Sequence, residues 1–564
     1  MNLYVQVTEE LREVDVIIAG GGTAGCILAS RLSDADPNLS VLVVEAGPNN
    51  FEDPSIIYPA FYLQHLLPQS KATKFYRGKK ASQLAGQEPV VATGCILGGG
   101  SSINAAIRGG PGSHGYAGEV HVSDGGYRGL TSENDFIAAM QQLGYPEIVD
   151  LQSLDANNGV ERSNRYVSLE GRRQDTAHAY LHPRLRDGKH PNLHVLVEAE
   201  VRRVLLNGAK RAVGVEYKPR SGAEVRTVKA RRLVVVSGGA CGTPLILERS
   251  GIGNPEILER AGVPVLANLP GVGRNYQDHQ MTFYPYKTGL AAEETLDRIL
   301  NGGVDPRVLI ENKDKVLGWN SIDASAKIRP IVEAELDALG PEFRRAWNRD
   351  YANSNKPLIL MFLHGCLLGD PTVAPPGQYV SVVNYTAYPY SRGHIHITGP
   401  DLEDAVDFEV GFFSDAHDID LKKQLWAYKK QREVMRRTQL YRGEVASAHP
   451  RFPPGSAAAC VSVDAPLRDV RDLVYSAEDD AAIEQWLRER VGTLWHSLGT
   501  CKMAPRSGLG VVDPDLNVYG VQGLKIADLS IPPLQVGANT NNTAMVIGEK
   551  AADIIIRELG LGRG

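Results

Sequence analysis

The stretch 14–47 near the N-terminus constrains the fold of this 564-residue chain more than any other. An apolar run at 14–18 fits a strand that is buried on both faces, and a glycine-rich turn follows it directly. The segment 24–32 has helical character, and a second apolar run at 41–44 fits another buried strand. This order of elements predicts a βαβ unit with two parallel strands.

Three glycines in the turn have the spacing G-x-G-x-x-G. Gly20 permits the tight turn, Gly22 lets the backbone approach a pyrophosphate, and Gly25 allows close contact between helix and strand. The positive end of the helix faces the phosphates. Glu45, after the second strand, can accept hydrogen bonds from a ribose. The unit therefore predicts a dinucleotide site that suits NAD and FAD equally well.

Composition and chain ends exclude several other classes of protein. The net charge of −6 does not indicate a basic surface that would bind nucleic acid. The sequence contains no run of eighteen apolar residues, so no membrane span is predicted. The N-terminus lacks an apolar signal core and the C-terminus lacks an S-K-L tripeptide, so we expect a cytoplasmic location. The six cysteines show no C-x-x-C pair and are expected to be free thiols. His394 and His396 alternate along a strand without further ligands, so we expect no metal site.

Later stretches repeat the glycine-rich chemistry. Residues 94–104, GCILGGGSSIN, supply backbone N–H groups that can converge on another part of the same cofactor. Residues 238–253, GGACGTPLILERSGIG, follow a buried strand at 232–237 and again open a helix. Near the C-terminus, 524–528 fits one more buried strand, and a helix is predicted from about 541 to 560. The nucleotide-binding domain is therefore predicted to be discontinuous, with parts from both ends of the chain.

Residues 285–490 differ from the rest of the chain in their pattern of helical and strand-like stretches. Helical stretches such as 331–348 and 421–441 alternate with strand-like ones at 358–367 and 379–397. This pattern predicts an α/β fold in which an α+β substrate-binding domain, built on an antiparallel sheet, is inserted into a Rossmann-like domain. We assign the Rossmann-like domain to residues 1–150, 191–284 and 491–564, and the substrate-binding domain to residues 151–190 and 285–490.

Two C-terminal stretches hold the polar residues best suited to catalysis. His496 follows Trp495 among small and apolar neighbours, so we expect a buried imidazole whose proton affinity matters for catalysis. The alternative is a histidine that lies in the core with its hydrogen bonds satisfied and has no catalytic role. Asn539 lies between a glycine-rich turn and the last helix, where the alternative is a helix cap. The residues by themselves leave these alternatives open.

Four motifs, in this order, resemble the glucose–methanol–choline (GMC) oxidoreductases, flavoenzymes that use FAD to oxidise alcohols. They are GGGTAG with Glu45, GCILGGGSSIN, GGACGTPLILERSGIG, and WHSLGT with the terminal GLKIADLSIPPLQVGANTNNTA. The similarity runs from about residue 13 to residue 560. Within the family, RGKK, NLPGVGRNYQDH, PYSRGHIHITGPD and TLWHSLGTCKMAPR are most similar to fungal alcohol oxidases of the methanol type.

The resemblance implies a reaction. In the family, the residue that matches His496 takes the hydroxyl proton of the substrate, and the residue that matches Asn539 helps to hold the developing alkoxide. A hydride then passes to the flavin, and in an oxidase dioxygen restores the flavin and yields hydrogen peroxide. The expected activity is oxidation of a primary alcohol to the aldehyde. A dehydrogenase with another electron acceptor and a hydroxynitrile lyase of the same fold are the alternatives.

The resemblance also implies where FAD lies. The expected cofactor-binding residues are Gly20, Gly22, Thr23, Ala24, Gly25, Glu45, Ala46, Gly98, Gly99, Ser101, Ser102, Asn104, Val201, Trp495, Asp528, Ala538 and Asn539. Some members of the family attach FAD covalently through a histidine in the second motif. This chain reads Ser102-Ile103-Asn104 at that place, so noncovalent FAD is expected.

The segment after Asn104 departs from the family. The alcohol oxidases continue with a cluster of bulky apolar residues and a loop that closes over the active site, whereas this chain has Ala105, Ala106, Ile107 and then RGGPGSHG at 108–115. Either a closing loop is missing or the pocket is open. Smaller side chains leave volume beside the flavin, so we infer an alcohol larger than methanol.

The resemblance also implies a role for His279 and suggests partners and a location for the protein. His279, in NYQDH, is expected to order a loop beside FAD rather than to titrate in catalysis. The expected partners are an alcohol and dioxygen. The resemblance also allows a homo-oligomer and a peroxisomal location.

Overall fold

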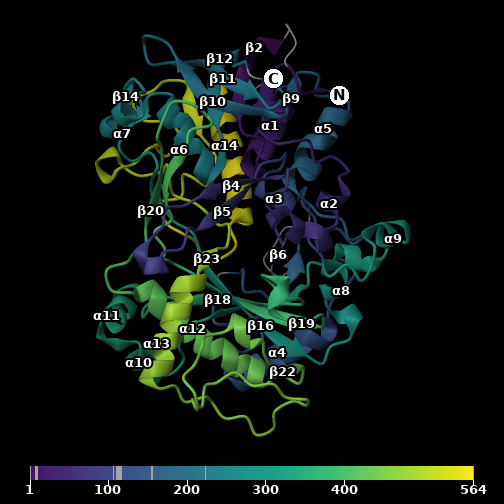
Figure 1. The fold of residues 1–564 in the computed structure, drawn as a ribbon. Coiled ribbons are helices and arrows are strands. Elements are labelled where there is room, and N and C mark those ends of the chain that lie inside the picture. The colour runs from purple at the N-terminus through teal and green to yellow at the C-terminus, as the bar shows by residue number, and fades with distance from the viewer. Residues whose placement is uncertain are drawn as a thin grey trace.

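The computed structural model describes residues 2–6, 11–105, 107–108, 117–153, 156–222 and 224–562 of the chain. Two large sheets organise these residues, one in the upper half and one in the lower half of Figure 1. The upper sheet is largely parallel and the lower one is antiparallel. The predicted α/β fold class is thereby confirmed.

The upper sheet is built around the opening βαβ unit. Strand β2 (Glu13–Ala19) pairs in parallel with β3 (Val41–Val44), and helix α1 (Thr23–Ala35) connects them. The other strands are β1 (Leu3–Tyr4), β9 (Leu193–Leu196), β10 (Ala199–Leu206), β11 (Ala212–Pro219), β12 (Arg226–Val236) and β24 (Leu524–Ile526). Their order is β1-β9-β3-β2-β12-β11-β10, and β24 pairs with β12. Strands from both ends of the chain therefore share one sheet.

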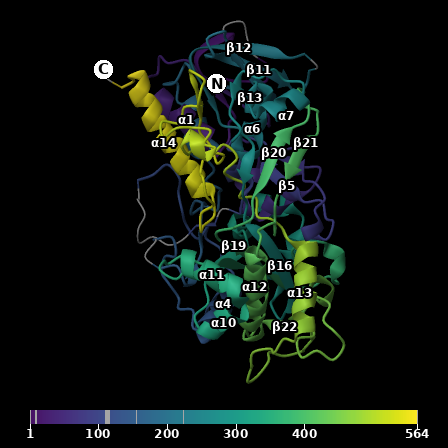
Figure 2. The same cartoon turned by 90° about the vertical axis from the view of Figure 1, so that its left-hand side faces the viewer.

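Helix α14 (Asn541–Leu559) brings the C-terminal segment back onto α1, and the two helices lie side by side in Figures 1 and 2. The close approach needs Gly548, because a Cβ there would lie 2.9 Å from the carbonyl oxygen of Ala24. Arg31 on α1 adds a bidentate ion pair with Glu549, with both N···O distances at 2.9 Å. The last helix is thus fixed directly to the first.

The lower sheet has the order β22-β16-β19-β18-β17-β7, and β23 pairs with β16. These strands are β7 (Gly159–Arg162), β16 (Gln280–Thr288), β17 (Ile322–Ile328), β18 (Ile359–His364), β19 (Tyr379–Thr386), β22 (Tyr441–Glu444) and β23 (Gly492–Thr493). Helices α4 (Leu130–Gln142) and α12 (Ile419–Arg436) cover one face, and α13 (Ala477–Arg490) packs on α12. The other face is left to line a cavity.

Several elements differ from the expected divisions. The strand expected over 379–397 is two strands, since β20 (Gly393–Ile397) joins β15 (Arg274–Tyr276) and β21 (Val406–Glu409) in a small third sheet. The helix expected over 331–348 is also two helices, α10 (Glu333–Ala338) and α11 (Gly340–Asp350), because Gly340 at the start of α11 takes a φ of +85°.

Packing also departs from the expected domain limits in two places. Helix α4 lies within 1–150 but packs against β7 and β17 of the lower sheet. The turn and helix over 177–186 lie within 151–190 but pack against α1 and β9 of the upper half. Among the described residues, no helix has the length and apolar character needed to cross a membrane.

A buried ion pair ties α12 to the lower sheet. Arg432 on α12 is 1% exposed, and its Nη2 lies 2.8 Å from Oε1 of Glu444 on β22. Its Nη1 donates to the carbonyl oxygen of Ala458 at 2.7 Å, while Glu444 Oε2 accepts from the N–H of Val461 at 3.0 Å. Burial opposes ionisation of Glu444, but the guanidinium outweighs it and lowers the pKa of that carboxyl below its usual value. The pair is therefore charged and fully hydrogen-bonded.

We predict that Arg432→Met lowers the free energy of unfolding by about 3–5 kcal/mol, because it leaves the Glu444 carboxylate buried without its counter-charge. In the wild type, this contribution is present at neutral pH and is lost as the pH falls through the lowered pKa of Glu444, since the unfolded carboxyl titrates at about 4.3. Chemical denaturation followed by circular dichroism measures both effects. Arg307→Met, which breaks an exposed pair with Asp305, is the control and should leave the midpoint unchanged. Equal losses in the two variants would contradict this assignment.

Candidate functional site

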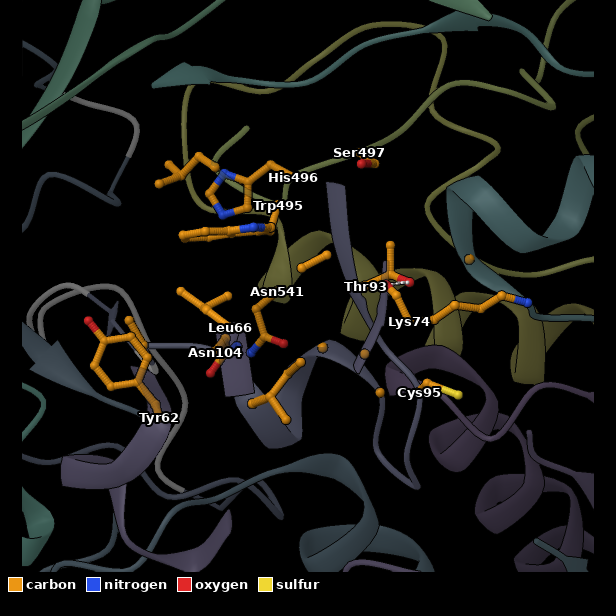
Figure 3. A pocket seen from close by; sticks show the side chains of 18 of the residues that line it. Tyr62, Leu66, Lys74, Thr93, Cys95, Asn104, Trp495, His496, Ser497 and Asn541 are labelled. Carbon is orange, nitrogen blue, oxygen red and sulfur yellow. Dashed lines mark hydrogen bonds between the residues drawn. The ribbon is translucent and has the colours of Figure 1, made fainter. Parts of the chain in front are cut away.

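A cavity of about 880 Å³ lies between the two large sheets. The carboxyl ends of β2, β3 and β24 open into it, which is where ligands bind in parallel sheets. Residues from the opening glycine turn and from the C-terminal segments line the same cavity. In Figure 3, His496 and Trp495 face Asn541 and Asn104 across the space between them.

The glycine turn approaches the cavity as closely as the sequence predicts. Gly20 has a φ of +118°, and a Cβ there would overlap the carbonyl oxygen of Ser237. A Cβ at Gly25 would overlap the carbonyl oxygen of Gly20. From the second glycine motif, a Cβ at Gly99 would lie 2.8 Å from the Cα of Gly22. Bare backbone from two distant motifs thus forms one cradle, which fits the pyrophosphate of a dinucleotide.

Two buried carboxylates stand at strand ends beside this cradle. Glu45 follows β3 and accepts from the N–H groups of Gly21 and Gly47, both at 2.8 Å, while burial raises its pKa to about 7. Asp528 follows β24 and accepts from the N–H of Gly239 at 2.9 Å, and burial raises its pKa too. Both side chains are anchored by backbone and keep oxygen lone pairs for hydroxyl groups of a ligand.

Most residues predicted to bind the cofactor line the cavity, and some lie behind it. Those on the lining are Gly20, Gly22, Thr23, Ala24, Glu45, Ala46, Gly99, Asn104, Val201, Trp495, Asp528 and Asn539, together with the predicted base His496. Those not on the lining are Gly25, Gly98, Ser101, Ser102 and Ala538. The two serines hold the glycine loop instead, because their hydroxyls donate to the carbonyl oxygens of Gly98 and Leu97 at 2.6 and 2.7 Å. Of the RGGPGSHG stretch, residues 109–115 lie outside the described residues.

Asp278 shapes the loop that carries the predicted base. Its buried carboxylate accepts from the hydroxyl of Thr493 at 2.5 Å and from the N–H of His496 at 3.0 Å. Between these contacts, Trp495 takes a φ of +60°, a left-handed conformation that non-glycine residues adopt only when their surroundings enforce it. The strained turn places the Trp495 indole directly beside the His496 ring (Figure 3).

His279 determines which nitrogen of His496 carries the proton. The Nε2 of His279 lies 2.8 Å from the carbonyl oxygen of Val536, which can only accept, so Nε2 must carry a hydrogen. Burial lowers the pKa of His279 to about 4, and its neutral ring therefore has a lone pair at Nδ1. That atom lies 2.8 Å from Nδ1 of His496, which must then be the donor. His496 is left with a lone pair on Nε2 and can act as a base there.

Tyr385 performs a similar task for Asn539. Its hydroxyl donates to Oδ1 of Asn539 at 2.8 Å, which leaves the amide Nδ2 free to donate to a ligand. The Tyr385 ring also packs against both histidines, with centroids 5.3 Å from His279 and 6.2 Å from His496. One tyrosine therefore contacts the amide and packs beside the imidazole base.

Sequence reasoning missed some of these residues. Tyr385 and Asn541 were not among the candidates, although Asn541 points into the cavity and belongs to the quoted NTNNTA motif (Figure 3). His279 was expected to order a loop rather than to titrate in catalysis, and the structure adds a contact between its ring and the His496 ring. Its place in NYQDH was the available signal. Among the described residues, no group of three His, Cys, Asp or Glu side chains is arranged to hold a metal ion.

The fold and the cavity define a two-domain protein in which a glycine cradle suited to a dinucleotide lies on the same cavity as a buried histidine. Family comparison agrees with this class. The profiles of the GMC oxidoreductases match residues 111–281 and 389–548, while a lycopene cyclase profile matches only residues 15–55 in the opening βαβ region.

Relatives match over nearly the whole chain. The alcohol oxidase of Candida boidinii is 35% identical over 97% of this chain and 95% of its own length. Alcohol oxidase 1 of Komagataella phaffii is 34% identical over the same shares. The chain therefore belongs to the GMC oxidoreductase family, whose cofactor is FAD.

Solved structures support the fold. An FAD-dependent oxidoreductase from Chaetomium thermophilum superposes with a TM-score of 0.76 at 24% identity, covering 97% of this chain and all of that one. A formate oxidase variant from Aspergillus oryzae gives a TM-score of 0.80 at 21% identity, covering 97% and 98%. At these identities the likeness concerns the fold alone.

We predict that Gly25→Ala abolishes flavin binding, because the new Cβ would overlap the Gly20 carbonyl oxygen and push the phosphate turn open. The ratio of absorbance at about 450 nm to that at 280 nm in purified protein measures flavin content. Gly492→Ala is the matched control, since a Cβ there meets nothing within 4 Å. Full flavin content in the Gly25 variant would show that this close contact is dispensable.

Proposed function

We propose that the chain is an FAD-dependent alcohol oxidase that converts a primary alcohol and dioxygen into the aldehyde and hydrogen peroxide. The observation that carries the proposal is the neutral base His496 and the amide of Asn539 on one cavity with the nucleotide-binding glycines. The alcohol oxidases among the relatives support the same reaction.

His496 acts as the general base. Its Nε2 lone pair takes the hydroxyl proton of the alcohol, and the resulting alkoxide releases hydride far more readily than the alcohol does. Burial, and then the neighbouring His279, lower the pKa of His496 well below its usual value of about 6.5, so the base is unprotonated at neutral pH. Activity should therefore fall only when the pH drops through that lowered pKa.

Asn539 holds the oxygen from which the proton leaves. Its Nδ2 donates to the developing alkoxide, and the bond from Tyr385 keeps the amide in that orientation before the substrate arrives. The glycine cradle with Glu45 and Asp528 would hold FAD, which would supply the hydride acceptor. On reoxidation, dioxygen would take up two electrons, the proton of the hydride and the hydroxyl proton to give hydrogen peroxide.

We infer that the FAD is noncovalent. Ile103 and Asn104 line the cavity where a family histidine would attach the flavin. Cys95 and Cys241 also line the cavity, but burial raises the pKa of each thiol to about 12. Both thiols stay protonated at neutral pH, and a protonated thiol is a poor nucleophile.

We predict one peroxide for each alcohol consumed by the purified protein, and bleaching of the flavin near 450 nm when alcohol is added without oxygen. Acid precipitation of the same preparation should release the flavin into solution. Peroxide assay, anaerobic spectroscopy and the supernatant spectrum check the three results. Bleaching without peroxide would favour a dehydrogenase, and no bleaching by any alcohol would favour a hydroxynitrile lyase.

We predict that His279→Leu slows flavin reduction by ~100-fold, because His496 loses the acceptor that keeps its proton on Nδ1. His279→Gln should recover most of the rate, since a glutamine oxygen can accept from His496 while its amide donates to Val536. Stopped-flow reduction under anaerobic conditions measures both. Equal rates in the Leu and Gln variants, with flavin bound in each, would rule out the tautomer role.

A further inference from the structure

The lower sheet presents two chemically different faces. On β16, Thr282 donates to Gln424 at 3.0 Å and Tyr286 donates to Gln431 at 2.7 Å, and both glutamines belong to α12. The intervening Phe283 lines the cavity instead. Because successive side chains of a strand alternate between faces, the sheet turns these polar groups to the helix and keeps the other face for the cavity.

The cavity face carries three rows of side chains that cross neighbouring strands. We define the first row as Met281 and Tyr385, the second as Phe283, Val383 and Phe362, and the third as Ser381 and His364. Each row lies two residues beyond the previous one, which is about 7 Å along the strands. The third row therefore lies about 13 Å from the first.

The first row meets the catalytic groups. Tyr385 donates to Asn539 at 2.8 Å and packs beside His496, so the rows lead from the reacting oxygen into the lower half of the molecule. The second row is entirely apolar, and its three members line the cavity. A tail attached to the reacting carbon would lie against this row.

The third row carries no charge. Burial lowers the pKa of His364 to about 3, so its ring is neutral. The two ring nitrogens of His364 are already bonded, one to the hydroxyl of Tyr62 and the other to the hydroxyl of Ser321 at 2.9 Å. A polar group at the far end of a substrate would find these partners taken, and an apolar tail would not need them.

The apolar surface then continues towards solvent. Leu368 packs against the apolar cluster that contains Phe362 and Val383 of the second row. It also packs against a separate apolar cluster that includes Ile299 of helix α8 (Asp297–Leu300). Leu300, on the same helix, lines the cavity and is 42% exposed. The cavity therefore opens at this end, and a tail is not stopped by a closed floor.

We propose that the substrate is a primary alcohol with an unbranched aliphatic tail, a medium-chain alkanol, whose tail lies on the second and third rows and points towards Leu300. This inference rests on the proposed alcohol oxidation and names the substrate class for the same site. The rows extend over about 13 Å, a length that a linear chain can follow and a single aromatic ring cannot.

Anaerobic flavin reduction by the holoenzyme, measured for each member of the series from methanol to 1-decanol and for benzyl alcohol, tests the proposal. The value of kcat/KM should rise about fourfold for each methylene that becomes buried and should level off once the tail reaches solvent. Methanol or ethanol as the best substrate, or benzyl alcohol above every alkanol, would overturn it. Failure of all alcohols to reduce the flavin would instead overturn the proposed function.

Leu368→Trp should block the tail, and the ratio of kcat/KM for 1-octanol to that for ethanol should fall at least tenfold. Leu300→Asp places a charge at the exposed end and should lower the same ratio by a smaller factor without disturbing a packed core. Leu169→Trp, at a residue that is 76% exposed and off the cavity lining, is the control and should leave the ratio unchanged. Unchanged ratios in both cavity variants, with flavin bound, would refute the proposed tail path.

Discussion

The hydrogen bond between Nδ1 of His279 and Nδ1 of His496 is the interaction on which the proposed chemistry depends. It joins residues 217 positions apart, and it sets a protonation pattern as well as a geometry. The pattern starts at the Val536 carbonyl oxygen, which forces the proton of His279 onto Nε2 and so leaves the proton of His496 on Nδ1. An imidazole without such a partner could present either nitrogen to the substrate. The protein therefore selects the basic form of the ring before substrate binds.

Asp278, the residue before His279, positions the backbone around His496. Asp278 accepts from the N–H of His496 and from the Thr493 hydroxyl, and these bonds hold Trp495 in its left-handed conformation. Burial raises the pKa of Asp278 to about 6 even though its hydrogen-bond donors act to lower it. A carboxylate and an imidazole that are adjacent in the chain thus divide the work: one fixes the loop and the other fixes the proton.

The sequence predicts best those features that depend on near neighbours. The contacts of Gly20 with Gly25 and of Gly21 with Glu45 join residues within 24 positions, and the motif spacing reports them directly. His496 and Asn539 are different, because the residues alone left a core histidine and a helix cap as alternatives and the family resemblance carried the choice. The partners of this pair had no local signal. Tyr385 reaches Asn539 across 154 positions, and only strand register and loop closure bring the two together.

Domain limits failed for a related reason. Helix α4 has an ordinary amphipathic pattern. Such a pattern predicts that one face of the helix is buried, but it does not indicate which sheet the helix packs against. The same holds for the turn and helix over 177–186, which pack on α1. Assignment by position along the chain therefore placed both in the wrong half.

Strand β19 links the orientation of the Asn539 amide to the proposed path of the substrate tail. Tyr385, which orients Asn539, and Val383, in the middle of the second row, are two residues apart on it and share one face. Their separation of about 7 Å is fixed by the pleat of a strand that is hydrogen-bonded on both sides. A shift of one residue in register would turn both side chains away from the cavity together. In the proposed reaction, a single rigid element therefore sets both the position of the reacting oxygen and the surface for the tail.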